Sequence, residues 1–168
     1  GAGQNIGRGI ALSLSASGAI IVVNGRDNEG LVSETVAEIK KNGGNAVGYM
    51  ADIADPISVK TLIDKIKSDL GGLDILICNA GLRRQTKFLD MSFSEWREIL
   101  SVALDGAFLL TKAAVPLLMD RGGGSIVALS GISHHIGTVN RCHVSASKAG
   151  LEGLMRSLAM ELAPYGIT

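Results

Sequence analysis

The most informative part of the chain is the stretch SIVALSGISHHIGTVNRCHVSASKAG, residues 125–150. Its first five residues, Ser125–Leu129, form an apolar run of strand length, and a loop containing glycine, serine and histidine follows. From about Cys142 to Leu162 the sequence predicts a long helix, which carries Lys148. A buried strand that leads through a loop into a helix is the repeating unit of an α/β domain.

The same alternation of strand and helix runs through the rest of the chain. Apolar, β-branched runs predict strands, and amphipathic segments between them predict helices. The predicted strands are residues 19–23, 45–51, 73–79 and 125–129, and the predicted helices lie within residues 1–17, 28–41, 55–70, 92–119 and 142–162. This succession implies right-handed crossovers and a doubly wound parallel sheet with helices on both faces. We therefore predict one Rossmann-type α/β domain over residues 1–168.

Composition limits the function classes. The chain has 168 residues, 46% of them hydrophobic, which is enough for one domain with a sizeable core. Lys plus Arg equals Asp plus Glu at 16 each, so no net charge attracts a nucleic acid or an anionic membrane. Cys78 and Cys142 form neither a disulfide framework nor a zinc spacing, which favours a cytoplasmic setting. We find no apolar run of roughly 18 residues and expect a soluble protein.

Glycines cluster in the first seven residues, GAGQNIG, on a turn that opens a helix. The backbone N–H groups of such a turn and the N-terminus of the helix can bind a pyrophosphate. Taken alone, the pattern fits an ordinary glycine-rich turn equally well. Residues elsewhere in the chain must therefore discriminate between the two interpretations.

The segment VSASKAG, residues 144–150, closely resembles the YSASKAG signature of the short-chain dehydrogenases/reductases. The resemblance extends over essentially the whole chain and includes the glycine-rich turn and the sequence CNAG at residues 78–81. It implies a Rossmann-type domain that binds NAD(P) and moves hydride between the nicotinamide and a carbonyl or alcohol carbon. Reduction of an activated C=C bond is a related possibility.

The resemblance also implies that the chain is an internal segment of a protein about half as long again. The family places a strand before the glycine-rich turn, in the middle of the sheet, and another strand after the position of Thr168. We therefore expect the fold to be incomplete at both ends. The strands ending at Val23 and Asn79 should face an unfilled gap, and the 168-residue domain alone should be unstable.

The resemblance assigns the cofactor-binding residues. Against the family pattern T-G-x-x-x-G-x-G, Gly1 and Gly7 match and Asn5 replaces the middle glycine; asparagine tolerates a left-handed backbone better than other non-glycine residues. Asp52 falls where the family has the Asp that holds the adenine ring. The expected cofactor contacts are Gly1, Gln4, Asn5, Ile6, Gly7, Arg26, Asp52, Ile53, Asn79, Ala80, Gly81 and Lys148.

The choice between NAD and NADP depends on the end of the strand at Val23. In the sequence VVNGRD, the acidic position of the family is occupied by Gly25, and Arg26 follows. An arginine there can bind the 2′-phosphate of NADP, so NADP(H) is favoured over NAD(H). In the competing interpretation Asp27 accepts a hydrogen bond from the ribose 2′-OH, and Arg26 is a solvated surface charge.

Most catalytic positions of the resembled family hold other residues here. In that family a Tyr transfers the proton, a Lys lowers its pKa and binds the ribose, a Ser orients the substrate oxygen, and an Asn supports a proton-relay water. The corresponding residues are Val144, Lys148, Gly131 and Ala103. Only the Lys is present. Because removal of a positioned acid or base typically costs about 10² to 10⁴ in rate, ordinary ketone reduction should be slow or absent.

Two neighbours are candidate replacements for the lost catalytic groups. His143 precedes Val144, and a neutral histidine suits proton transfer near pH 7. Adjacent helix positions point about 100° apart, however, so a helix-capping or surface His143 is the favoured interpretation. Ser130 flanks Gly131 and is the second candidate.

A metal site is not expected from the sequence. His134, His135 and His143 lack the i, i+4 spacing of a helical pair and an obvious carboxylate partner. Arg83 and Arg84 lie where the substrate loop of the family begins; they either meet an anionic substrate or remain solvated.

Two functional hypotheses stay open. In the first, the chain is an NADP(H)-dependent oxidoreductase with a non-standard active site that acts on a small molecule. In the second, it is a noncatalytic NADP(H)-binding subunit or sensor. The resemblance further implies a homo-oligomer, a dimer or tetramer, formed through the long helices that begin near Ser92 and Cys142.

Overall fold

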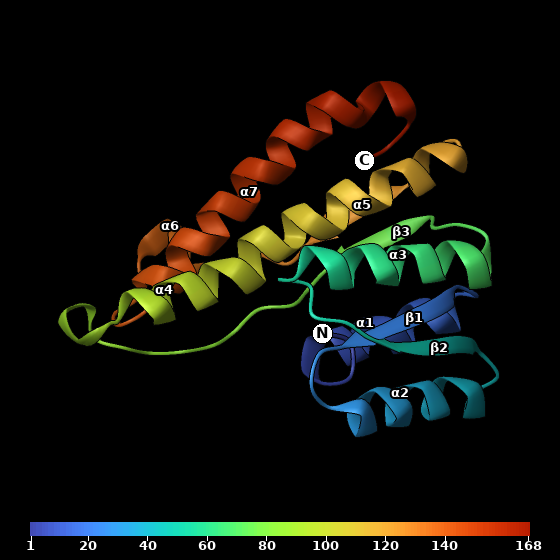
Figure 1. The fold of residues 1–168 in the computed structure, drawn as a ribbon, viewed down its shortest axis with the longest axis horizontal. Helices are drawn as coiled ribbons and strands as arrows, with labels where there is room; N and C mark the ends of the chain where they lie inside the picture. The colour runs from blue at the N-terminus through green and yellow to red at the C-terminus, as the bar shows by residue number, and fades with distance from the viewer.

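The computed structural model describes all 168 residues and has parallel strands that alternate with helices (Figure 1). The predicted elements are all present, and the long helix predicted over residues 142–162 has these bounds. The helices are α1 (Asn5–Ala16), α2 (Glu29–Lys41), α3 (Pro56–Leu70), α4 (Phe93–Leu100), α5 (Gly106–Asp120), α6 (Ser133–Ile136) and α7 (Cys142–Leu162), and the strands are β1 (Ile20–Gly25), β2 (Asn45–Met50), β3 (Ile75–Cys78) and β4 (Ser125–Ala128).

The strands form two parallel pairs. β1 pairs with β2 in the register Ile20 to Asn45, and β3 pairs with β4 in the register Ile75 to Ser125. β1 and β3 are not hydrogen-bonded to each other. Their facing edges line a cavity of about 470 Å³, together with residues of α1 and α3. The α/β architecture is thus confirmed, and the expected gap separates the two pairs.

Apolar side chains form two main core regions. The first contains Val23 of β1 and Ile39 of α2, which are almost fully buried. The second lies where α3 packs on α5 and contains Val59 and Ala114. Both strand pairs are therefore held by helices, as the alternating pattern predicts.

The helix predicted over residues 92–119 is interrupted by a π-helical turn. α4 and α5 are joined by Ser101–Asp105, which has π-helical hydrogen bonding. The hydroxyl of Ser92 accepts a hydrogen bond from the N–H of Glu95 at 3.1 Å, so Ser92 caps the N-terminus of α4. The Glu95 side chain bonds elsewhere, to Thr86.

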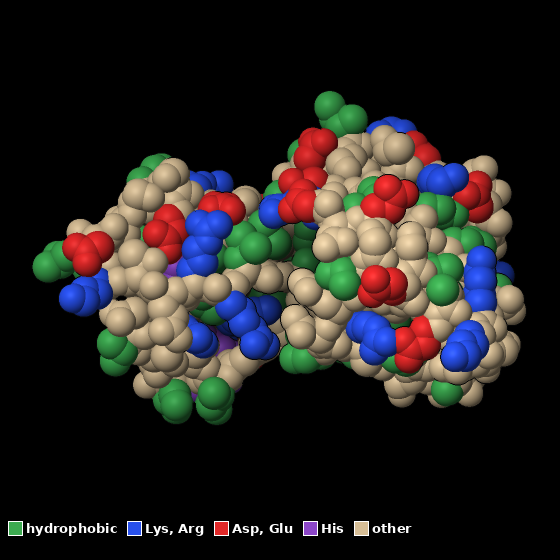
Figure 2. All heavy atoms as spheres, turned by 90° about the horizontal axis from the view of Figure 1, so that it is seen from below, with side chains coloured by type: hydrophobic (Ala, Val, Ile, Leu, Met, Phe, Trp, Pro, Cys, Tyr) green, Lys and Arg blue, Asp and Glu red, His purple; other side chains and the backbone are tan.

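The combined helix Phe93–Asp120 is long and apolar enough to cross a membrane. This segment was not identified from the sequence, because we found no apolar run of sufficient length there. Half of its most apolar window is buried inside the molecule, and Ala114 and Leu118 are fully buried. Core helices of soluble proteins have the same length and composition, so this helix is weak evidence for a membrane span. On the face shown in Figure 2, acidic and basic side chains are intermixed.

The last residues run beside β4. Ile167 forms a parallel bridge with Gly124, and the N–H of Ile126 donates to the carbonyl of Thr168 at 2.7 Å. Residues 167–168 thus lie in the position of a further strand next to β4, as the resemblance implied.

Candidate active site

The glycine-rich turn has the backbone that a phosphate-binding loop requires. Asn5 has a φ of 51°, in the left-handed region, and it is the first residue of α1. A Cβ added to Gly7 would lie 2.1 Å from the carbonyl oxygen of Gly1, so only glycine lets the helix pack directly on the turn. No side chain caps the N-terminus of α1, and Gln4, Asn5 and Ile6 are exposed there. The turn therefore presents uncapped backbone N–H groups of the kind that bind phosphate.

The turn is joined to the residues after β3. The side-chain amide of Asn79 donates to the carbonyl oxygen of Gly1 at 2.7 Å. A Cβ on Gly1 would lie 3.2 Å from the Cα of Ala80, and a Cβ on Gly81 would lie 3.9 Å from the Nζ of Lys148. Residues far apart in the sequence thus meet at the carboxyl ends of β1 and β3, where α/β folds bind nucleotides.

Lys148 lies on α7 and points toward the loop after β4. Its Nζ donates to the carbonyl oxygen of Leu129. Burial is the main cause that lowers the pKa of Lys148; Cys78 acts in the opposite direction, and Arg83 lowers the pKa further. The ammonium group is therefore held by backbone on one side and lies beside Gly81 on the other.

Three further predicted cofactor residues already make contacts within the protein. The Nε of Arg26 donates to Asp27 at 2.6 Å, and both side chains are exposed, so the two residues that the competing interpretations invoked form one ion pair. Asp52 accepts a hydrogen bond from the N–H of Ala54 at 2.9 Å. Ile53 is 7% exposed and belongs to the core, so its side chain is not available at the surface.

The positions that correspond to the family's Ser, Tyr and Asn differ in their surroundings. Gly131 is exposed, and a Cβ added to it would meet nothing within 4 Å. Val144 is half-buried on α7, one turn before Lys148. Ala103 is 4% exposed within the π-helical turn. Ser130 is exposed beside Gly131. A larger polar side chain therefore has space at residue 131.

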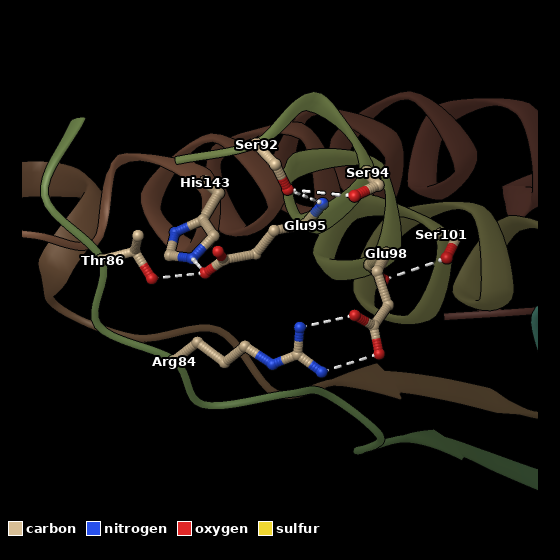
Figure 3. Close-up of polar contacts among 8 residues, drawn as sticks. All are labelled: Arg84, Thr86, Ser92, Ser94, Glu95, Glu98, Ser101 and His143. Carbon is tan, nitrogen blue, oxygen red and sulfur yellow. Dashed lines mark hydrogen bonds and ion pairs between the residues drawn. The ribbon is translucent and has the colours of Figure 1, made fainter. Parts of the chain in front are cut away.

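The interpretation of His143 as a capping or surface residue is wrong. His143 is fully buried, because α4 packs across the first turn of α7. Its Nε2 lies 3.3 Å from Oε1 of Glu95, which also accepts a hydrogen bond from the Thr86 hydroxyl at 2.5 Å (Figure 3). The Thr86 hydroxyl is the main cause that lowers the pKa of Glu95, and His143 lowers it further. His143 thus links α7 to α4 and to the loop after β3.

Arg84 in that loop is also held by α4. Its two terminal nitrogens donate to the two carboxylate oxygens of Glu98 at 2.5 and 2.8 Å (Figure 3). Such a bidentate pair offsets the charge of the guanidinium. Of the two arginines considered as anion ligands, Arg84 is therefore already paired.

The sequence interpretation also missed a carboxylate beside the histidines. Glu152, on α7, lies next to His134 and His135 of α6, so the premise that these histidines lack an acidic partner is wrong. Ser130 is the main cause that lowers the pKa of Glu152, and His134 lowers it further. No spacing rule predicts this contact, because α6 was not foreseen and the partners lie on separate elements.

Comparison with known proteins agrees with this arrangement. The family model described as short chain dehydrogenase matches residues 1–168. A 3-oxoacyl-[acyl-carrier-protein] reductase from Synechocystis sp. is 34% identical over 168 residues, which are 100% of this chain and 68% of the relative.

Two solved structures share the fold. A gluconate 5-dehydrogenase from Burkholderia cenocepacia J2315, in complex with NADP and tartrate, has a TM-score of 0.94 and 28% identity, with 100% of this chain and 66% of that chain covered. A metagenomic short-chain oxidoreductase in complex with NADP has a TM-score of 0.94 and 29% identity, with 99% and 75% covered. The chain thus spans about two thirds to three quarters of the length of these relatives, and it belongs to the short-chain dehydrogenase family.

Proposed function

We propose that this chain is the nucleotide-binding part of an NADP(H)-dependent oxidoreductase with a non-standard catalytic site. The observation that carries the proposal is the position of the Lys148 ammonium beside Gly81, on the segment that Asn79 ties to the glycine-rich turn. A solvated surface lysine would not need this placement. In the proposed complex, the Nζ of Lys148 would also meet the nicotinamide ribose between the two loops.

The residues present fit a dinucleotide. The uncapped N-terminus of α1 and the left-handed Asn5 would hold the pyrophosphate, and Asn79, Ala80, Gly81 and Lys148 would hold the ribose and nicotinamide end. When bound, the nicotinamide supplies the hydride that is exchanged with a carbonyl, alcohol or activated C=C carbon. The chain itself binds the cofactor and orients its ring.

NADP(H) is the proposed cofactor because Arg26 follows β1 where an acidic residue would select NAD(H). Two relatives in the solved structures carry NADP, which supports this choice. Asp27 holds only the Nε of Arg26, and the terminal nitrogens remain for a 2′-phosphate. A charge-assisted contact of this kind contributes about 1.5 to 3 kcal/mol, or roughly 10- to 200-fold in affinity.

Fluorescence titration with NADPH and NADH tests this assignment. Arg26→Ala should weaken NADPH binding by roughly 10- to 200-fold and leave NADH binding nearly unchanged. Asp27→Asn is the matched variant for the competing interpretation, because it weakens NADH binding if Asp27 holds the 2′-OH. Equal NADPH affinity in wild type and Arg26→Ala removes the argument for NADP(H).

The second candidate function is a noncatalytic NADP(H)-binding subunit or sensor. It is supported by the residues at positions 103, 131 and 144 and by the burial of His143 against Glu95, which directs that imidazole at α4. NADPH binding without turnover on a panel of aldehydes, ketones, 3-oxoacyl thioesters and enones favours the sensor. Steady, substrate-dependent NADPH oxidation favours the enzyme.

We further propose a cytoplasmic homo-oligomer. Phe93 of α4, Phe108 of α5 and Met160 of α7 are exposed by 77%, 45% and 81%, and a self-association surface would cover such side chains. Sedimentation of the purified protein, with Phe108→Ser as the comparison, measures the assembly.

A further inference from the structure

Three side chains with metal-binding atoms converge beside the loop after β4. His134 and His135 come from α6 and Glu152 from α7, and one donor atom from each lies within 4.8 Å of the other two. Oε1 of Glu152 lies 2.9 Å from Nε2 of His134 and 3.7 Å from Nε2 of His135. Both imidazoles thus approach the same carboxylate oxygen.

His134 has buried polar atoms that the protein leaves without partners. Its side chain is 6% exposed, and neither ring nitrogen has a hydrogen-bond partner. Nε2 of His134 lies 2.9 Å from Oε1 of Glu152, so a cation at this nitrogen would also meet the carboxylate. Buried polar atoms are normally satisfied, and a cation between the imidazole and the carboxylate would satisfy this nitrogen.

We propose that His134, His135 and Glu152 bind a divalent transition-metal ion, with Zn²⁺ as the best-suited ion. Two imidazoles and one carboxylate form a donor set that Zn²⁺ uses, and three protein ligands leave a fourth position open. Ligand atoms on one tetrahedral Zn²⁺ with bonds of about 2.0 to 2.2 Å lie about 3.3 to 3.6 Å apart. The His135 side chain is 58% exposed, so it can rotate toward the other two ligands to close the site.

The surroundings of Glu152 support the same arrangement. Its second oxygen, Oε2, lies 3.5 Å from Arg156, one turn further along α7, so Oε1 is the atom directed at the histidines. Contacts of this kind orient a ligating carboxylate. Glu152 also lies one turn beyond Lys148, so both side chains are on the same face of α7. A bound ion would tie the loop that contains Gly131 to this face.

The experiment uses purified protein that has been stripped of metal by a chelator. ZnCl₂ is titrated in competition with a chromophoric chelator, and one equivalent per chain should bind. Glu152→Gln and His135→Ala should each weaken Zn²⁺ binding by at least the roughly 10- to 100-fold that outer-shell changes typically cause. Glu161→Gln is the matched control, because Glu161 is an exposed glutamate on the same helix.

A thermal measurement gives a readout that is independent of activity. Zn²⁺ should raise the melting temperature of wild type and of Glu161→Gln, and it should not raise that of Glu152→Gln. NADPH titration of Glu152→Gln separates this site from the nucleotide site, since its NADPH affinity should equal that of wild type. The proposal is overturned if wild type binds no Zn²⁺, or if Glu152→Gln binds it as tightly as wild type does.

Discussion

We call the part of the molecule around the proposed nucleotide site, residues 1–81, the nucleotide end, and the part around Gly131 and Val144 the catalytic end. The two ends differ in which features of the family pattern are present. Around residues 1–81, the glycine-rich turn keeps its conformation even where a residue differs from the family pattern, since Asn5 adopts a left-handed φ of 51°. Around Gly131 and Val144 the backbone elements are also in place, but the side chains that would move a proton are not. Backbone donors tolerate substitution, whereas proton transfer does not.

This contrast arises because phosphate binding depends on backbone groups, whereas proton transfer depends on particular side chains. A phosphate is bound by N–H groups and a helix terminus, which every non-proline residue supplies if its φ and ψ are right. Proton transfer needs one titratable atom at one position, and a valine, such as Val144, supplies none. The two ends can therefore diverge at different rates within one fold.

The largest effect is expected from restoring the catalytic end. Val144→Tyr combined with Gly131→Ser should raise the rate of NADPH-dependent carbonyl reduction by about 10² to 10⁴, the usual contribution of a positioned acid or base. The serine has space, because nothing lies within 4 Å of a Cβ at residue 131. Steady-state oxidation of NADPH with a panel of carbonyl substrates measures this.

Lys148→Met in the restored background is the control and should abolish the gain, because in the proposed site the lysine would hold the ribose and assist the tyrosine. No gain in the double variant would show that the catalytic end lacks more than these two groups. That result would favour the noncatalytic hypothesis.

The next effect concerns the close approach of α1 to the turn. Gly7→Ala should destabilise the protein by about 1 to 3 kcal/mol and weaken NADPH binding, because its methyl group would lie 2.1 Å from a backbone oxygen. Gly9→Ala, two residues further along α1, is the matched control. A Cβ there meets nothing within 4 Å, so this change should stabilise by about 0.4 to 1 kcal/mol. Urea unfolding of the two variants should give opposite signs; equal signs would contradict the geometry of the turn.

The sequence predicts those features that depend on local pattern. The helix over residues 142–162 was predicted with its observed bounds because its apolar residues recur at helical spacing and Pro164 follows. The strands were predicted from apolar, β-branched runs, and the left-handed Asn5 from the known tolerance of asparagine.

Contacts between distant segments were not predictable in this way. His143 meets Glu95, and His134 meets Glu152, only because α7 packs against α4 and α6. A single sequence contains no periodicity that reports which helices pack together. The π-helical turn at Ser101–Asp105 escaped prediction for a related reason, since its residues fit an ordinary helix equally well.

A smaller effect is expected for the contact between the two helices of the catalytic end. The Thr86 hydroxyl, and then His143, lower the pKa of Glu95 in the folded state. A depressed carboxyl pKa stabilises the fold above the pKa of the unfolded chain, and this stability is lost as the pH falls through the folded pKa. Wild type should therefore lose stability on acidification below about pH 4.5, more steeply than Glu95→Gln does.

Urea unfolding at several pH values between neutral and acid measures this difference. Glu161→Gln, an exposed change on α7, is the control and should keep the wild-type profile. Parallel pH profiles for wild type and Glu95→Gln would show that the contacts of the Glu95 carboxylate with Thr86 and His143 do not contribute to the free energy of unfolding.

The smallest effect is expected at Asn5. Substitutions there distinguish a role of its backbone conformation from a role of its side chain. If Asn5 serves by adopting its φ of 51°, Asn5→Gly should leave NADPH affinity and stability within about 0.5 kcal/mol of wild type, because glycine adopts this conformation without strain. Asn5→Ala should cost about 1 kcal/mol, since an alanine Cβ is strained there. If instead the asparagine side chain contacts the cofactor, both variants weaken NADPH binding equally while only the alanine variant loses stability. Paired titration and unfolding of the two variants therefore determine whether the turn binds through its backbone alone.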